Sequence, residues 1–124
     1  MGTVTMAYRV MILEDDPFIA LDMENVMEDA GYDIAGPVAT VPEALKLIRD
    51  EPDKRPDCAL LDFNVTGGTT EFVARELARI GVPFMFVTGN ADDVRETLPE
   101  YDPLIRSKPV QIERVVKDVA TLLG

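Results

Sequence analysis

The fold is decided near the start of the chain, where residues 8–17 read YRVMILEDDP. The apolar centre of this stretch, VMIL at 10–13, is typical of a short strand buried on both faces. Acidic residues follow at once, and Asp16 stands before Pro17, as a capping carboxylate stands before a proline in the first helical turn. The stretch therefore predicts a buried strand that ends in acidic residues and leads directly into a helix.

The rest of the chain repeats this alternation. Gly31 ends the first helix, whose apolar residues roughly follow helical spacing: Phe18, Leu21, Val26 and Met27, with Ile19 and Met23 nearby. Further strands are expected at 33–39, 58–61, 83–87 and 104–106, and further helices at 40–50, 71–80, 91–98 and 111–123. The pair Gly36-Pro37 favours an edge position for the second strand, and residues 64–70 read as a glycine-rich turn. Five strand–helix alternations predict an α/β fold with a parallel sheet covered by helices on both faces.

Composition limits the classes of function. A length of 124 residues suits one domain over 1–124, with a loose leader expected at 1–6. No stretch is apolar enough to cross a bilayer and no signal peptide is visible, so we expect a soluble cytoplasmic protein. The net charge of −11 opposes binding to nucleic acid or to an anionic membrane. The single cysteine, Cys58, lies in an apolar run and is expected to be a buried hydrophobic residue.

The residues at the carboxyl ends of the expected strands are polar. Ligands of open parallel sheets bind at these ends. Acidic residues end the first and third strands, Thr88 ends the fourth, and Lys108 follows the fifth. Converging carboxylates repel unless a cation lies between them, and Mg²⁺ prefers oxygen ligands. Because Asp16 caps a helix, Glu14 and Asp15 are left to join Asp62 in a metal site.

A phosphoryl group held by such a metal needs further positive charge and hydrogen-bond donors, because its transfer depends on positioning and charge neutralisation. Lys108 and Thr88 would supply them, and backbone N–H groups of the glycine turn at 67–68 would add more. The chain contains no histidine, so a phosphohistidine donor must belong to another protein.

Four motifs in order, VMILEDD at 10–16, LLDFN at 60–64, FVTG at 86–89 and KP at 108–109, resemble the receiver domain of two-component response regulators. The match covers nearly the whole chain. The resemblance implies a flavodoxin-like doubly wound sheet with strand order 2-1-3-4-5. It also implies a set of roles: Asp62 as phosphoacceptor, Asp15 as direct ligand of Mg²⁺ (or Mn²⁺), Glu14 as ligand through water, Asn64 as ligand through its backbone carbonyl, Thr88 as switch hydroxyl, and Lys108 as partner of a phosphoryl oxygen, in a cis bond with Pro109.

Partners follow from the same resemblance. A histidine kinase or a phosphotransfer protein would donate the phosphoryl group. The chain would be a phosphoacceptor that assists its own phosphorylation and dephosphorylation, not an enzyme with a separate substrate. Its output would pass through contacts with a downstream protein, or the chain would drain phosphate from a kinase. Docking is expected on the first helix and after the fifth strand: Pro17, Phe18, Ile19, Pro109 and Val110.

Some positions depart from the common receiver pattern. Ile105 stands where many receivers have an aromatic residue, and Thr66 stands where a proline is common. With FVTG at 86–89, these departures resemble an alphaproteobacterial subgroup with the motif Phe-Ala-Thr-Gly-Gly-Tyr, which is associated with HWE or HisKA2 kinases. Val87 and Asn90 differ from that motif.

Two other functions fit parts of the sequence. A pseudo-receiver that serves only as a docking module would keep the fold without the phosphorylation. A Toprim-like, metal-dependent nucleic-acid enzyme would use Glu14 and the DFN segment at 62–64, but Asn64 replaces its second acid and the acidic chain lacks a basic groove.

Overall fold

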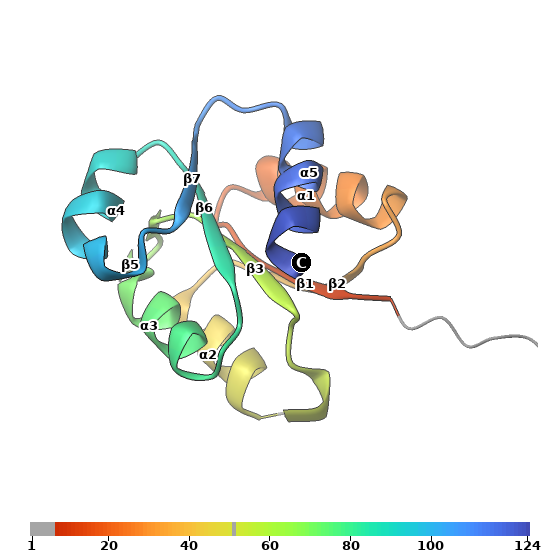
Figure 1. Cartoon of the computed structure of the whole chain (residues 1–124), viewed down its shortest axis with the longest axis horizontal. Coiled ribbons are helices and arrows are strands. Elements are labelled where there is room, and N and C mark those ends of the chain that lie inside the picture. Colours follow the sequence, from red (N-terminus) through yellow and green to blue (C-terminus); the bar gives the residue numbers. More distant parts are fainter. Residues whose placement is uncertain (1–6, 51) are drawn as a thin grey trace, which may run out of the picture.

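The structure is a computed structural model that describes residues 7–50 and 52–124, so the leader predicted at 1–6 lies outside the described residues. Figure 1 shows strands and helices alternating along the chain. The elements are β1 (Arg9–Leu13), α1 (Pro17–Asp29), β2 (Asp33–Val38), α2 (Val41–Arg49), the 3₁₀ turn η1 (Pro52–Lys54), β3 (Cys58–Leu61), β4 (Asn64–Val65), β5 (Gly68–Thr69), α3 (Glu71–Arg79), β6 (Phe84–Thr88), α4 (Ala91–Thr97), η2 (Pro99–Tyr101), β7 (Leu104–Ser107) and α5 (Ile112–Leu123).

Five strands form one parallel sheet in the order β2-β1-β3-β6-β7. When the five are counted alone, this is the predicted order 2-1-3-4-5, so the predicted flavodoxin-like fold is confirmed. The edge position of β2 is also confirmed. Gly36 has φ +99° there, and a Cβ would stand 2.7 Å from the Val38 nitrogen, so this position requires glycine.

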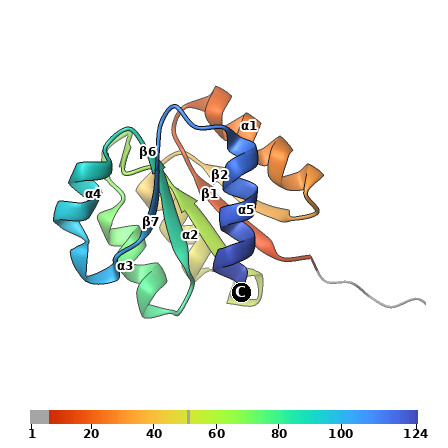
Figure 2. The ribbon, with the colours of Figure 1, turned by 45° about the horizontal axis from the view of Figure 1, so that its top comes forward.

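Alternation along the strands divides the core into two layers, one on each face of the sheet (Figure 2). Met11 and Leu13 of β1 face the layer that α2, α3 and α4 cover, whereas Val10 and Ile12 face α1 and α5. Both layers combine buried strand residues with buried residues of the covering helices. No helix of the described residues has the length and apolar character that crossing a membrane requires.

Capping contacts confirm the predicted starts of α1 and α2. Asp16 Oδ1 accepts hydrogen bonds from the backbone N–H groups of Phe18 and Ile19 at 2.9 and 3.3 Å. Thr40 caps α2: its hydroxyl accepts a hydrogen bond from the Glu43 N–H and donates one to the Glu43 carboxylate. Because Asp16 is used in this way, the acids left at the end of β1 are Glu14 and Asp15.

Two features differ from the sequence expectation. The side of α1 that packs on the sheet contains Ala20, Met23 and Met27, while Leu21 lies exposed, as does the predicted docking residue Phe18. The helix carries apolar residues on two stripes, and spacing alone did not separate the stripe that meets the sheet. The turn predicted at 64–70 contains a small antiparallel ribbon of β4 and β5. Val65 is buried in this ribbon, so its pairing is supported by packing against the core.

Candidate metal and phosphoryl site

The carboxyl-terminal end of the sheet brings the predicted site residues together. Backbone hydrogen bonds continue beyond the last strand residues: Glu14 N–H donates to Val38 C=O at 3.0 Å, and Asp62 N–H donates to the Leu13 carbonyl at 2.9 Å. The Lys108 N–H donates to the Thr88 carbonyl, also at 2.9 Å. These bonds extend the parallel register and hold the strand ends side by side.

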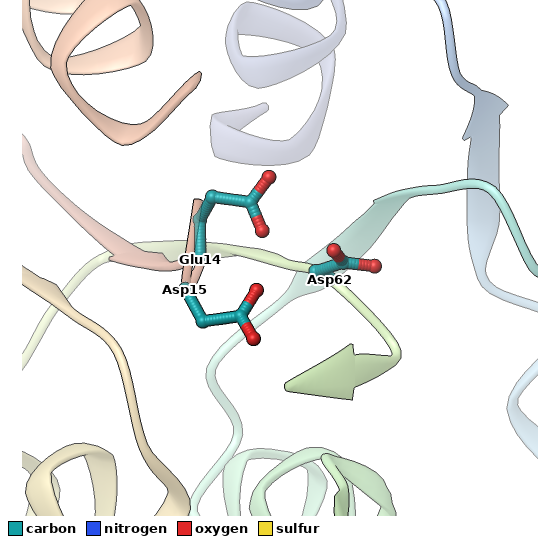
Figure 3. Close-up of side chains that lie close together, drawn as sticks. All are labelled: Glu14, Asp15 and Asp62. Atoms are coloured by element: carbon teal, nitrogen blue, oxygen red, sulfur yellow. The ribbon is translucent and has the colours of Figure 1, made fainter. Parts of the chain in front are cut away.

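Three carboxylates meet at this end of the sheet. One carboxylate oxygen from each of Glu14, Asp15 and Asp62 lies within 4.8 Å of the others. Figure 3 shows the Glu14 and Asp15 side chains, from the end of β1, directed to the side on which Asp62 stands. Glu14 is buried, Asp62 is largely buried, and Asp15 is partly exposed.

Lys108 pairs with two of these carboxylates. Its Nζ donates to Glu14 Oε1 at 2.5 Å and to Asp62 Oδ2 at 2.9 Å. The other Asp62 oxygen, Oδ1, accepts a hydrogen bond from the Phe63 N–H at 2.7 Å. Both Asp62 oxygens therefore have a donor, and the side chain of Lys108 spans from the end of β7 to the acids of β1 and β3.

The environment separates the pKa values of the two buried acids. Burial raises the pKa of Glu14 to about 7, and the Asp62 charge adds to this effect against the opposing influence of Lys108. Burial also acts to raise the pKa of Asp62, but hydrogen bonding with Lys108 and Glu14 outweighs it and lowers that pKa. For Lys108, burial is likewise outweighed by its two carboxylate partners, so its pKa is raised. Asp62 and Lys108 are the groups held in their charged forms.

The residues fit a small divalent cation. Glu14 Oε2 is a buried side-chain oxygen with no hydrogen-bond partner among the described residues. Such an atom is costly to bury unless something satisfies it. Three carboxylates around one ammonium also leave an excess of negative charge, and carboxylate oxygens are the ligands that Mg²⁺ prefers.

The other predicted site residues have contacts of their own. Thr88 is fully buried at the end of β6, and its hydroxyl accepts a hydrogen bond from the Asn90 N–H at 3.1 Å. Asn64 lies exposed in β4, paired with Thr69. The bond between Lys108 and Pro109 is cis, as predicted. Ile105 is half-buried against the core layer that includes α4.

Sequence reasoning missed two contacts of the segment after Asp62. The Thr66 hydroxyl donates to Asp15 Oδ2 at 3.1 Å, and the Thr70 hydroxyl, fully buried, donates to the Asp62 backbone carbonyl at 2.7 Å. The sequence shows Thr66 only as a departure from proline, and it predicts a turn where the structure has the hairpin that presents its hydroxyl. The position was thus visible in the sequence, while its contact depends on the fold of 64–69.

The predicted docking residues lie next to the site. Phe18 is 84% exposed, an unusual state for a phenylalanine. Ile19, Pro109 and Val110 line a groove of about 410 Å³ between α1 and the segment before α5, with Lys108 at its wall. Pro17 is exposed at the start of α1. The groove therefore opens beside the Asp62–Lys108 pair.

Comparisons with known proteins agree with this arrangement. The chain is 34% identical over 85 residues to the phyllosphere-induced regulator PhyR of Methylorubrum extorquens, a match that covers 67% of the chain and 31% of that protein. It is 34% identical over 91 residues to the DNA-binding response regulator MtrA of Mycolicibacterium smegmatis, covering 73% of the chain and 38% of that protein. The chain thus spans about a third of the length of these curated relatives. No family model matches the sequence.

Among solved structures, the response regulator receiver protein from Burkholderia phymatum superposes with a TM-score of 0.81 at 27% identity, over 94% of this chain and 95% of that one. The sheet order and the acidic strand ends beside a lysine define a CheY-like receiver domain. The chain belongs to the response regulator receiver domains.

Proposed function

We propose that this receiver accepts a phosphoryl group on Asp62 in a metal-dependent reaction and so acts in two-component signalling. The observation that carries the proposal is the Lys108 ammonium between Glu14 and Asp62, beside a third carboxylate. A fold without this function has little reason to gather three acids at one end of a sheet, because their mutual repulsion opposes folding.

The metal would be Mg²⁺ or Mn²⁺. Asp15 and Asp62 would bind it directly, Glu14 through water, and Asn64 through its backbone carbonyl. When bound, the cation neutralises negative charge on the oxygens of the incoming phosphoryl group. The unsatisfied Glu14 Oε2 supports this role, since a metal-bound water would supply its missing partner.

In the transfer, an oxygen of the Asp62 carboxylate forms a bond to phosphorus while the donor's bond to phosphorus breaks. With a phosphohistidine donor, the N–P bond breaks and the imidazole leaves with the bonding electron pair. The lowered pKa of Asp62 keeps its carboxylate ionised and therefore nucleophilic. Lys108 remains an ammonium and moves its pairing to a phosphoryl oxygen, and the buried Thr88 hydroxyl serves as the switch that responds to the new group.

The donor would be a histidine kinase or a phosphotransfer protein that docks on Pro17, Phe18, Ile19, Pro109 and Val110. The exposed Phe18 ring and the adjoining groove support this surface. A kinase of the HWE or HisKA2 type is favoured by the FVTG motif at the end of β6. The output would be a contact with a downstream protein, or the drainage of phosphate from the kinase.

Beryllofluoride, a mimic of the phosphoryl group, tests the site without a kinase. With Mg²⁺ present, we expect it to change the amide NMR signals of the wild-type protein around Asp62, Thr88 and Lys108. The Asp62→Asn variant should give no such change. If beryllofluoride leaves the wild-type spectrum unchanged, the result would instead favour a pseudo-receiver that serves only as a docking module.

Phosphotransfer from a kinase tests the docking surface separately. Phe18→Ala should slow transfer from a histidine kinase but leave phosphorylation by acetyl phosphate unchanged. Phe72→Ala is the matched control, because Phe72 is also exposed, at 55%, but lies on α3. Equal transfer to both variants would contradict the proposed surface.

A further inference from the structure

The side chain of Thr66 contacts the candidate metal site. Its hydroxyl donates to Asp15 Oδ2 at 3.1 Å, across 51 positions of sequence. Asp15 is partly exposed and lies beyond the last residue of β1, so burial alone does not fix its rotamer. Because an aspartate that must hold one rotamer loses conformational freedom on binding a ligand, a partner that pre-orients it favours binding.

The hairpin that carries Thr66 is held to the phosphoacceptor. Thr70 closes the segment by donating its hydroxyl to the Asp62 carbonyl and its N–H to the Phe63 carbonyl, at 2.7 and 2.8 Å. Val65 anchors the ribbon in the core, where its side chain is buried. Threonine is also stiff at χ1, so the direction of the Thr66 hydroxyl is restricted. These contacts therefore hold the Thr66 hydroxyl in position to donate to Asp15.

We propose that Thr66 is a positioning residue that orients the Asp15 carboxylate for the divalent cation. Its hydrogen bond occupies one Asp15 oxygen and leaves the other for the metal. Hydrogen-bond partners of ligating carboxylates orient those ligands and raise metal affinity. The inference rests on the proposed function, because it requires a cation at this cluster.

The test is the affinity for Mg²⁺, measured by calorimetric titration of the metal-free protein. Thr66→Val removes the hydroxyl and keeps the shape. We expect it to weaken Mg²⁺ binding by a factor of about 3–10, which is within the range for a typical intramolecular hydrogen bond. Thr66→Ser keeps the hydroxyl and should bind within about twofold of wild type. Thr69→Val, on the other strand of the hairpin, is the matched control and should bind as wild type does.

A purely structural role for Thr66 gives a different pattern. It would lower the stability of the metal-free Thr66→Val protein, measured by urea unfolding, and would leave its Mg²⁺ affinity unchanged. Equal affinity of Thr66→Val and wild type, or equal losses in Thr66→Val and Thr66→Ser, would overturn the proposal. A wild-type protein that binds no Mg²⁺ would overturn this proposal and the metal-dependent function together, whereas the former results would leave the function intact.

Discussion

Removing the charge of Asp15 should stabilise the metal-free protein, although it damages the proposed site. Asp15→Asn takes away one of three converging carboxylates and keeps an oxygen for the hydrogen bond from Thr66. Substitutions in functional sites often raise the stability of a protein while they impair its function. The size and sign of the effect follow from the charges around Asp15.

Two unit charges 4.8 Å apart, the limit for the oxygens of this cluster, repel by about 0.9 kcal/mol in water. The value for water suits Asp15 because its side chain is partly exposed. Asp62 contributes this repulsion in full, and Glu14 contributes part of it because its pKa is about 7. The attraction between Lys108 and Asp15 offsets roughly the repulsion from one full negative charge. We therefore expect Asp15→Asn to raise the metal-free unfolding free energy by about 0.5 kcal/mol.

Magnesium should reverse the order of stability of Asp15→Asn and wild type. A ligand present at about 100 times its dissociation constant stabilises the native state by about 2.7 kcal/mol. If the substitution weakens binding a hundredfold, which is the upper end of the loss for mutating only a partner of a metal ligand, the same concentration adds only about 0.4 kcal/mol. The variant should therefore be more stable than wild type with a chelator and less stable with Mg²⁺.

Urea unfolding followed by circular dichroism, in chelator and in Mg²⁺, measures both effects. Asp53→Asn is the matched control, since Asp53 is exposed in η1, which precedes β3 and so lies away from the carboxyl ends of the strands. A response to Mg²⁺ that is as large in Asp15→Asn as in wild type would refute the reasoning.

Two more predictions concern buried groups. Lys108→Met should lower the metal-free unfolding free energy by about 2–4 kcal/mol, because it leaves two buried carboxylates without their cation, while the exposed Lys117→Met should have little effect; equal urea midpoints for the two variants would contradict this. Cys58 is fully buried and burial raises the pKa of its thiol to about 12, so iodoacetamide should modify it only as the protein unfolds; mass spectrometry that finds equally fast labelling in buffer and in urea would show the thiol to be accessible.

The sequence was informative wherever local chemistry decides the structure. Short apolar runs, a capping aspartate before Pro17 and glycines after helices predicted the sheet and its helices to within a few residues. The acids and the lysine at strand ends could be placed together because parallel strands all end at one end of the sheet. Their convergence needed only the strand order, which the resemblance supplied.

What could not be predicted depends on packing between distant parts. The exposure of Leu21 was hidden because α1 has two apolar stripes and only tertiary contact selects one. The contact of Thr66 with Asp15 depends on a hairpin whose pairing has no strong signal in a glycine-rich segment. The two hydrogen bonds of Lys108 could not be predicted either. The positions of strand ends predict which residues are close, but not which carboxylate oxygens share one donor.

The central claim is that Asp62 itself receives the phosphoryl group. The most direct measurement is the intact mass of the protein after incubation with acetyl phosphate and Mg²⁺, followed by location of the modified residue. We expect one added phosphoryl group on wild type, located at Asp62 and absent from both Asp62→Asn and a chelator-treated sample. The same added mass on Asp62→Asn would contradict this claim.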